Sequence, residues 1–70
     1  MVERKAVNSS NVVSVGYDPE TQTLAVEFKG GNVYHYHDVP GDVADGLMNA
    51  DSIGSHFAQN IRNAFQFTKQ

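Results

Sequence analysis

The chain has no cysteine and no long apolar run, and each absence excludes a class of protein. Without cysteine there is neither a disulfide nor a thiolate metal site. The longest apolar runs are two or three residues, far too short to span a bilayer, and no apolar segment follows the charged start to make a secretory signal. We therefore expect a cytoplasmic protein with no membrane partner.

Basic residues are also scarce. Five Lys and Arg residues stand against eight Asp and Glu residues, which gives a formal net charge of −3. Proteins that hold nucleic acid through its phosphates usually carry a basic face, whereas the cations of this chain are scattered along it. The balance argues against strong non-specific binding of DNA or RNA and suits a soluble protein or a basic partner.

The chain reads as one domain over residues 1–70, and residues 1–8 are expected to fray unless Val7 docks. Alternating apolar residues predict strands over 12–17, 23–28 and 33–37. A turn at Asp18-Pro19 and a glycine-rich hairpin loop after the second strand join them. The three strands form an antiparallel meander.

Two helices are predicted to follow the strands. Pro40 suits the first turn of a helix that carries Val43 and Leu47, and a second helix begins near Ser52 or Ser55 with apolar residues four apart. The fold class is therefore α+β, with a three-stranded antiparallel meander and two α-helices packed on one face of the sheet. The expected core is Val13, Val15, Leu24, Val26, Phe28, Val43, Leu47, Phe57, Ile61 and Phe65.

The register of the second hairpin decides which side chains are buried, because a one-residue slip exchanges the two faces of a strand. A loop of Gly30–Gly31 sets His35 opposite Val26, whereas a loop of Gly30–Asn32 sets Tyr36 there. We favour the longer loop, since a buried imidazole without a partner is costly and a tyrosine can bury its ring. The tyrosines then face the core and the histidines face away.

The order and spacing of a set of short motifs are specific: Ser9-Ser10, Val15-Gly16-Tyr17-Asp18, Leu24–Phe28, Gly31, Tyr34-His35-Tyr36, Val39-Pro40, Leu47, Ala50, Ser52, Gly54, Phe57 and Ile61-Arg62. Over roughly residues 7–65 they closely resemble the KTSC domain. That family occurs at the C-terminus of some lysyl-tRNA synthetases and as small proteins of bacteria and their phages. The chain has His56-Phe57-Ala58 where the family often has Tyr-Phe-Asn, and the aromatic residue after Ile-Arg falls at Phe65.

Tyr34 and Tyr36 are candidate binding residues. With Tyr17, and with Lys29 and Arg62 at their flanks, they are able to form a stacking platform for single-stranded RNA. Core packing is the favoured interpretation, because so small a domain needs its large rings inside. Arg62 fits a phosphate or carboxylate contact as well as it fits a structural salt bridge or hydrogen bond to a neighbouring strand or helix end.

Two further pairs carry chemistry. His35 and His37 lie on one side of a strand about 6–7 Å apart, a spacing open to metal binding or to acid–base catalysis. Exposed polar residues give the same pattern, so we expect no metal, no cofactor and no catalysis. Ser9 and Ser10 either hold an anion or a partner backbone or, as we favour, satisfy the start of the first strand.

We therefore expect a non-catalytic binding module, and the family resemblance implies RNA or tRNA as its partner. The alternative is a protein–protein interaction module, such as a phage or prophage accessory factor that acts on a host protein. The unpaired edges of a small sheet also make a homodimer through a sheet edge physically natural. An enzyme is the third hypothesis.

Overall fold

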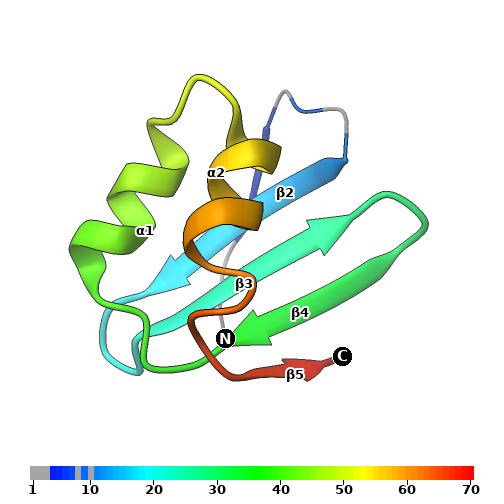
Figure 1. Cartoon of the computed structure of the whole chain (residues 1–70). Coiled ribbons are helices and arrows are strands. Elements are labelled where there is room, and N and C mark those ends of the chain that lie inside the picture. Colours follow the sequence, from blue (N-terminus) through cyan, green and yellow to red (C-terminus); the bar gives the residue numbers. More distant parts are fainter. Residues whose placement is uncertain (1–3, 8, 10) are drawn as a thin grey trace.

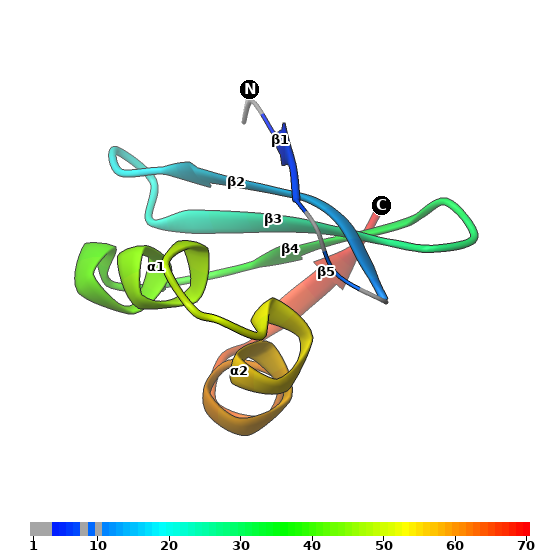
Figure 2. The same cartoon turned by 90° about the horizontal axis from the view of Figure 1, so that it is seen from above.

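The computed structural model describes residues 4–7, 9 and 11–70, which form an antiparallel sheet with two helices on one face (Figure 1, Figure 2). The strands pair in sequence order, and the α+β class predicted from the sequence is confirmed. The elements are β1 (Lys5–Ala6), β2 (Val12–Asp18), β3 (Thr23–Phe28), β4 (Asn32–Tyr36), α1 (Gly41–Met48), α2 (Ile53–Asn60) and β5 (Phe67–Lys69).

Strands β1 and β5 extend the predicted three-stranded meander by one short strand at each edge. They contain two and three residues, which is too short for an alternating pattern to be recognised. Next to β1, Val7 packs against the core and its amide donates to the Val13 carbonyl at 3.1 Å. The outer sides of β2 and β4, expected to be open edges, are therefore occupied.

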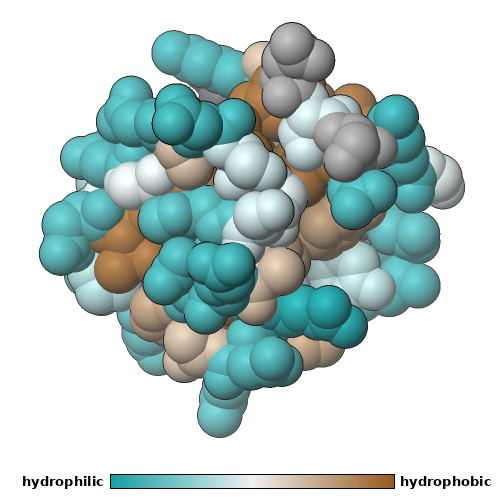
Figure 3. Space-filling model, turned by 45° about the horizontal axis from the view of Figure 1, so that its top comes forward, coloured by the Kyte–Doolittle hydropathy of each residue, from teal (hydrophilic) through white to brown (hydrophobic). Residues whose placement is uncertain are grey.

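The core lies between the sheet and the helices, and hydrophilic side chains dominate the surface seen in Figure 3. Six of the predicted core residues are buried and three more are partly buried against them, but Val13 is wrong, because its side chain is 38% exposed. The pairing of β2 with β3 is irregular between Val12 and Ser14, so Val12 takes the inward position. The largest fully buried side chains are Leu24, Leu47, Ile61, Val12, Val15, Val26 and Val39.

In the hairpin between β3 and β4, the side chains lie on the predicted sides of the sheet, but the two strands pair in a different register. The predicted pairing of Val26 with Tyr36 is wrong, because Val26 pairs with Tyr34. The loop is Lys29–Gly31 rather than Gly30–Asn32, and its two glycines have φ angles of 97° and 85°, a region open to glycine at little steric cost. The observed pairing differs from the predicted one by an even number of residues. Both tyrosines therefore stay on the face of the sheet that the helices cover.

Both helices begin near the predicted residues. Pro40 is the N-cap of α1, one position before the first turn, and its carbonyl accepts the amide of Val43 at 3.1 Å. Ser52 caps α2, where its side chain accepts the amide of Ser55 at 3.4 Å. In the described part of the chain, no helix has the length and apolar character needed to cross a membrane.

Helix α2 ends earlier than its apolar stripe suggests. The amides of Ile61 and Arg62 both bond to the carbonyl of Phe57 at 3.0 Å, which closes the helix at Asn60. Arg62, expected on the second helix, therefore lies in the turn that follows it, as does Phe65. This turn brings the chain back along β4 as strand β5.

Candidate functional site

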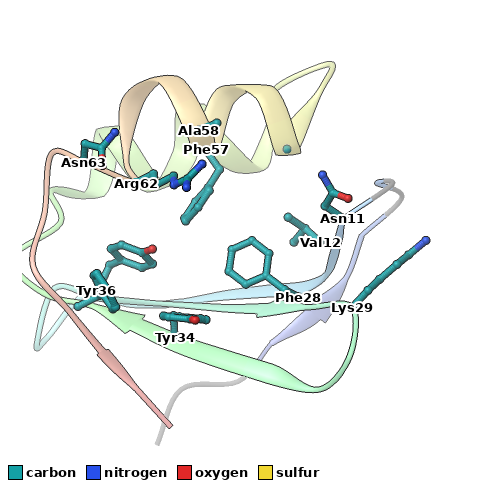
Figure 4. Close-up of a pocket in the computed structure, with 12 residues that line it drawn as sticks. Asn11, Val12, Phe28, Lys29, Tyr34, Tyr36, Phe57, Ala58, Arg62 and Asn63 are labelled. Carbon is teal, nitrogen blue, oxygen red and sulfur yellow. The ribbon is translucent and has the colours of Figure 1, made fainter.

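A groove of about 550 Å³ runs between the sheet and α2, and it falls in the size range of about 300–1,000 Å³ typical of ligand sites (Figure 4). Four expected site residues, Lys29, Tyr34, Tyr36 and Arg62, line it. We call it the aromatic groove. Its lining residues are Asn11, Val12, Phe28, Lys29, Tyr34, Tyr36, Gly54, Phe57, Ala58, Arg62, Asn63 and Phe67.

Aromatic rings from three segments form the floor of the aromatic groove. Tyr34 and Tyr36 share one face of β4 because they alternate along the strand, and Phe28 comes from the end of β3. Phe57 of α2 meets the rings of Phe28 and Tyr36 edge to face, with both centroid distances at 5.2 Å. Edge-to-face contacts are a favoured arrangement of aromatic rings, so they stabilise this floor.

The two tyrosines have different roles. Tyr36 is 3% exposed and belongs to the core, as favoured from the sequence, whereas Tyr34 is half-buried and packs against the core while lining the groove. Burial raises the pKa of Tyr36, the neighbouring phenol of Tyr34 adds to this effect, and the charge of Arg62 opposes it. The Tyr36 phenol is therefore neutral at physiological pH and offers a hydrogen-bond donor.

The charged and amide side chains of the aromatic groove lie around its rings. Figure 4 shows Asn63 toward one end of the groove and Asn11 and Lys29 toward the other, whereas Arg62 lies on the α2 side, next to Phe57. No carboxylate is among the described lining residues, although the chain carries a net charge of −3. The groove is thus a cationic and aromatic surface on an acidic protein.

The structural role expected for Arg62 is a salt bridge. Among the residues that the structure describes, the one salt bridge joins Arg4 to Glu27, with 3.9 Å between Arg4 Nη2 and Glu27 Oε1. Arg62 is exposed, and its side chain lies along the α2 side of the groove. Its guanidinium is therefore open to a ligand.

His35 and His37 lie apart from the groove, because His35 points to the face of the sheet away from the helices. His37 Nε2 and Thr68 Oγ1 are 2.8 Å apart, a hydrogen bond between β4 and β5. Burial lowers the pKa of His35, and the charges of Arg4 and His37 lower it further. Within residues 4–7, 9 and 11–70, no group of three or more His, Cys, Asp or Glu side chains is arranged to hold a metal ion.

Ser9 serves the start of β2. Its hydroxyl accepts the amide of Val12 at 3.4 Å, and it lies against Gly54 of α2, where an added Cβ would be 3.4 Å from Ser9 Oγ. This is the structural role favoured from the sequence. Ser10 lies outside the described residues, so the proposed role of the serine pair rests on Ser9 alone.

The other lining residues were not proposed as binding residues from the sequence, and Asn11, Asn63 and Phe67 are among them. Asn63 follows the Ile61-Arg62 motif directly, which was the available signal. Nothing in the apolar periodicity placed Phe67 next to β4, because that contact depends on the turn after α2. The two substituted residues of the first departure from the family pattern, His56 and Ala58, lie in different places. Ala58 lines the groove, whereas a Cβ on Gly46 of α1 would lie 3.6 Å from His56 Nε2.

Comparison with known proteins gives relatives of two kinds. An uncharacterised protein of Stutzerimonas stutzeri is 50% identical over 58 residues, which is 83% of this chain and 82% of that protein. A lysine–tRNA ligase of Nostoc punctiforme is 43% identical over 58 residues, which is 83% of this chain and 10% of the ligase. The same domain thus occurs alone and as a small part of a much longer enzyme.

The fold has a solved counterpart. The crystal structure of a KTSC domain protein from Yersinia pestis matches with a TM-score of 0.94 at 34% identity, and the match covers 100% of this chain and 99% of that one. The family model of the KTSC domain matches residues 8–65, which include β2, β3, β4 and both helices. The resemblance seen in the sequence is confirmed, and the chain belongs to the KTSC domain family.

Proposed function

We propose that the chain is a non-catalytic binding module that holds single-stranded RNA, such as an unpaired segment of a tRNA, in the aromatic groove. The observation that carries this proposal is the lining of the groove: aromatic rings, two cations and no carboxylate among the described residues. Proteins recognise single-stranded RNA by stacking bases on aromatic side chains and by pairing phosphates with Arg and Lys.

The arrangement of these groups suits an extended strand. Lys29 toward one end of the groove and Arg62 on its α2 side would each meet a phosphate of one strand, and the exposed aromatic surface of the groove would meet a base of that strand. The amides of Asn11 and Asn63 and the phenol of Tyr36 supply donors and acceptors for base edges and ribose hydroxyls. A net charge of −3 elsewhere weakens non-specific attraction, so binding depends on the groove.

The ligase relatives support an RNA partner. The lysine–tRNA ligase of Nostoc punctiforme contains a related segment in 10% of its length, and its name gives tRNA as its substrate. An RNA-binding groove on such a segment would act on the same substrate as the enzyme.

The test measures the affinity for a fluorescent single-stranded RNA across a salt series. Two phosphate contacts predict a slope of about −1.4 for the logarithm of the association constant against that of the salt concentration. Lys29→Gln and Arg62→Gln should each reduce the steepness by about 0.7. The matched control is Lys5→Gln, which removes an exposed cation on β1 outside the groove and should leave the slope unchanged.

Two results would contradict the proposal: no binding at low salt, or the same loss for Lys5→Gln as for the groove variants. A different result would instead favour the protein–protein interaction module. In that case a protein is captured from a bacterial lysate after nuclease treatment, its capture requires Arg62 and Tyr34, and added salt does not weaken it.

A further inference from the structure

We propose that Phe67, on the edge strand β5, provides the surface on which an RNA base stacks, so that β5 completes the binding site. This inference rests on the proposed function. Phe67 lines the aromatic groove and is 51% exposed. The other exposed large apolar residues in the described part of the chain are Val13, at 38%, and Met48, at 37%. A phenylalanine with about half of its surface exposed thus lies in a groove that two cations and two amides also line.

The other rings of the groove are less exposed. Tyr36 and Phe57 are 3% and 5% exposed, and Phe28 and Tyr34 are partly buried against the core and meet each other edge to face. A stacking base needs an open aromatic face, and Phe67 offers more of one than these packed rings do. Phe67 offers the largest exposed aromatic surface among the described groove residues.

Phe67 is also supported from behind. Its ring centroid lies 5.3 Å from that of Tyr34 and 5.4 Å from that of Tyr36, with interplanar angles of 57° and 38°. The three rings are already in contact, so a base does not enter between them and stacks on the outward side of Phe67. A ring held in place by two others loses little conformational entropy on binding.

The backbone on both sides of Phe67 is fixed to the sheet. The amide of His37 donates to the Gln66 carbonyl at 2.8 Å, and the amide of Gln70 donates to the Val33 carbonyl at 2.7 Å. The hydrogen bond between the side chains of His37 and Thr68, at 2.8 Å, adds a third link. Strand β5 has no buried residue, so these bonds and the ring contacts hold it against β4.

The position of Phe67 in the chain separates it from the shared family motif. The KTSC family model matches residues 8–65 and ends before β5, whereas Tyr34, Tyr36 and Arg62 lie inside it. The part of the chain that the family model covers therefore supplies both cations and the supporting rings, and the strand beyond it supplies the stacking face. Relatives with another residue here would differ in base preference and affinity.

The experiment uses the full chain and a single-stranded oligouridine that contains one 2-aminopurine, a base whose fluorescence falls on stacking. Wild-type protein should bind and quench the probe. Phe67→Leu keeps the apolar contact with the tyrosines but has no π-face, and it should weaken binding about tenfold and remove the quenching. Phe67→Tyr should restore both to within about twofold. Met48→Leu, an exposed apolar change on α1, is the matched control and should match the wild type.

A second variant keeps the test independent of how Phe67→Leu folds. The chain has no tryptophan, so Phe67→Trp introduces a single indole, whose emission should be quenched when the unlabelled RNA binds. Unchanged affinity and quenching in Phe67→Leu, or a Phe67→Trp emission that RNA does not alter at saturation, would overturn this inference and leave the RNA-binding groove standing. Absence of wild-type binding at low salt would overturn both proposals.

Discussion

The ring of Tyr36 on β4 meets the ring of Phe57 on α2 edge to face, with centroids 5.2 Å apart and planes at 80°. This contact joins the sheet to the helix and also forms part of the floor of the aromatic groove. Both residues are almost fully buried, at 3% and 5% exposed. The stability of the domain and the shape of its candidate site therefore depend on the same pair of rings.

Truncating Phe57 should destabilise the domain strongly. Phe57→Ala removes a buried ring that contacts Phe28 and Tyr36, and the expected loss in the free energy of unfolding is about 3–5 kcal/mol. Phe57→Leu retains much of the volume and should cost less. Urea unfolding followed by circular dichroism measures both, and a wild-type midpoint for Phe57→Ala would contradict the packing described here.

The hydroxyl of Tyr17 anchors the segment that leads into α1. It donates a hydrogen bond to the carbonyl of Val39, a fully buried residue whose own amide bonds to the Gln22 carbonyl at 2.9 Å. Tyr17→Phe leaves the Val39 carbonyl without this donor and should cost about 1–3 kcal/mol, the penalty for an unsatisfied buried group. Chemical denaturation tests this, and a stability equal to that of the wild type would mean that water replaces the hydroxyl.

Most of the fold was predictable because three strands and two helices carry strong local signals. The strand alternation, the Asp18 turn and the Ser52 cap are contained within a few neighbouring residues. The failures have one physical origin: they depend on pairing between segments. The irregular pairing near Val12 and the choice of Lys29 as a loop residue are decided by the partner strand, which local periodicity does not describe.

The candidate site, like the fold, was predicted from the sequence in part. The sequence proposed Tyr34, Tyr36, Lys29 and Arg62, and the structure brings these four to one groove. It places the histidines on the opposite face and leaves Ser9 at the start of β2, outside the groove lining. Phe67 was not proposed, because its place beside the tyrosines follows from the turn after α2 and not from any spacing in the sequence. The binding roles of all these residues remain predictions.

The first glycine of the β3–β4 loop should resist substitution. Gly30 has a φ of 97°, a conformation that is strained for residues with a Cβ, so Gly30→Ala should cost about 1–2 kcal/mol. Gly41→Ala is the control, since Gly41 begins α1 and an added Cβ there meets Tyr17 at an ordinary 4.0 Å. It should be neutral or stabilising by up to about 1 kcal/mol. Equal effects of the two substitutions on thermal unfolding would contradict the loop conformation.

A homodimer through a sheet edge remains a prediction, and the edges concerned are now β1 and β5. These strands have two and three residues, and short edge strands limit pairing with another chain. Deleting residues 67–70 should expose the five residues of β4 and shift the chain toward a dimer. Light scattering after size-exclusion chromatography gives the mass. A monomer for both proteins at high concentration would argue against edge pairing.

The pKa of His35 predicts how stability depends on pH. Burial, together with the charges of Arg4 and His37, lowers this pKa below its usual 6.5 in the folded chain, so the unfolded chain takes up a proton first as the pH falls. The contribution of His35 to stability is therefore complete above pH 6.5 and is lost as the pH falls through 6.5 toward the folded-state pKa. Urea unfolding between about pH 5.5 and pH 7.5 should show this loss. His35→Gln should flatten the dependence, and Arg4→Gln should reduce it, because one of the two neighbouring charges is gone. An unchanged slope in His35→Gln would assign the effect to other groups.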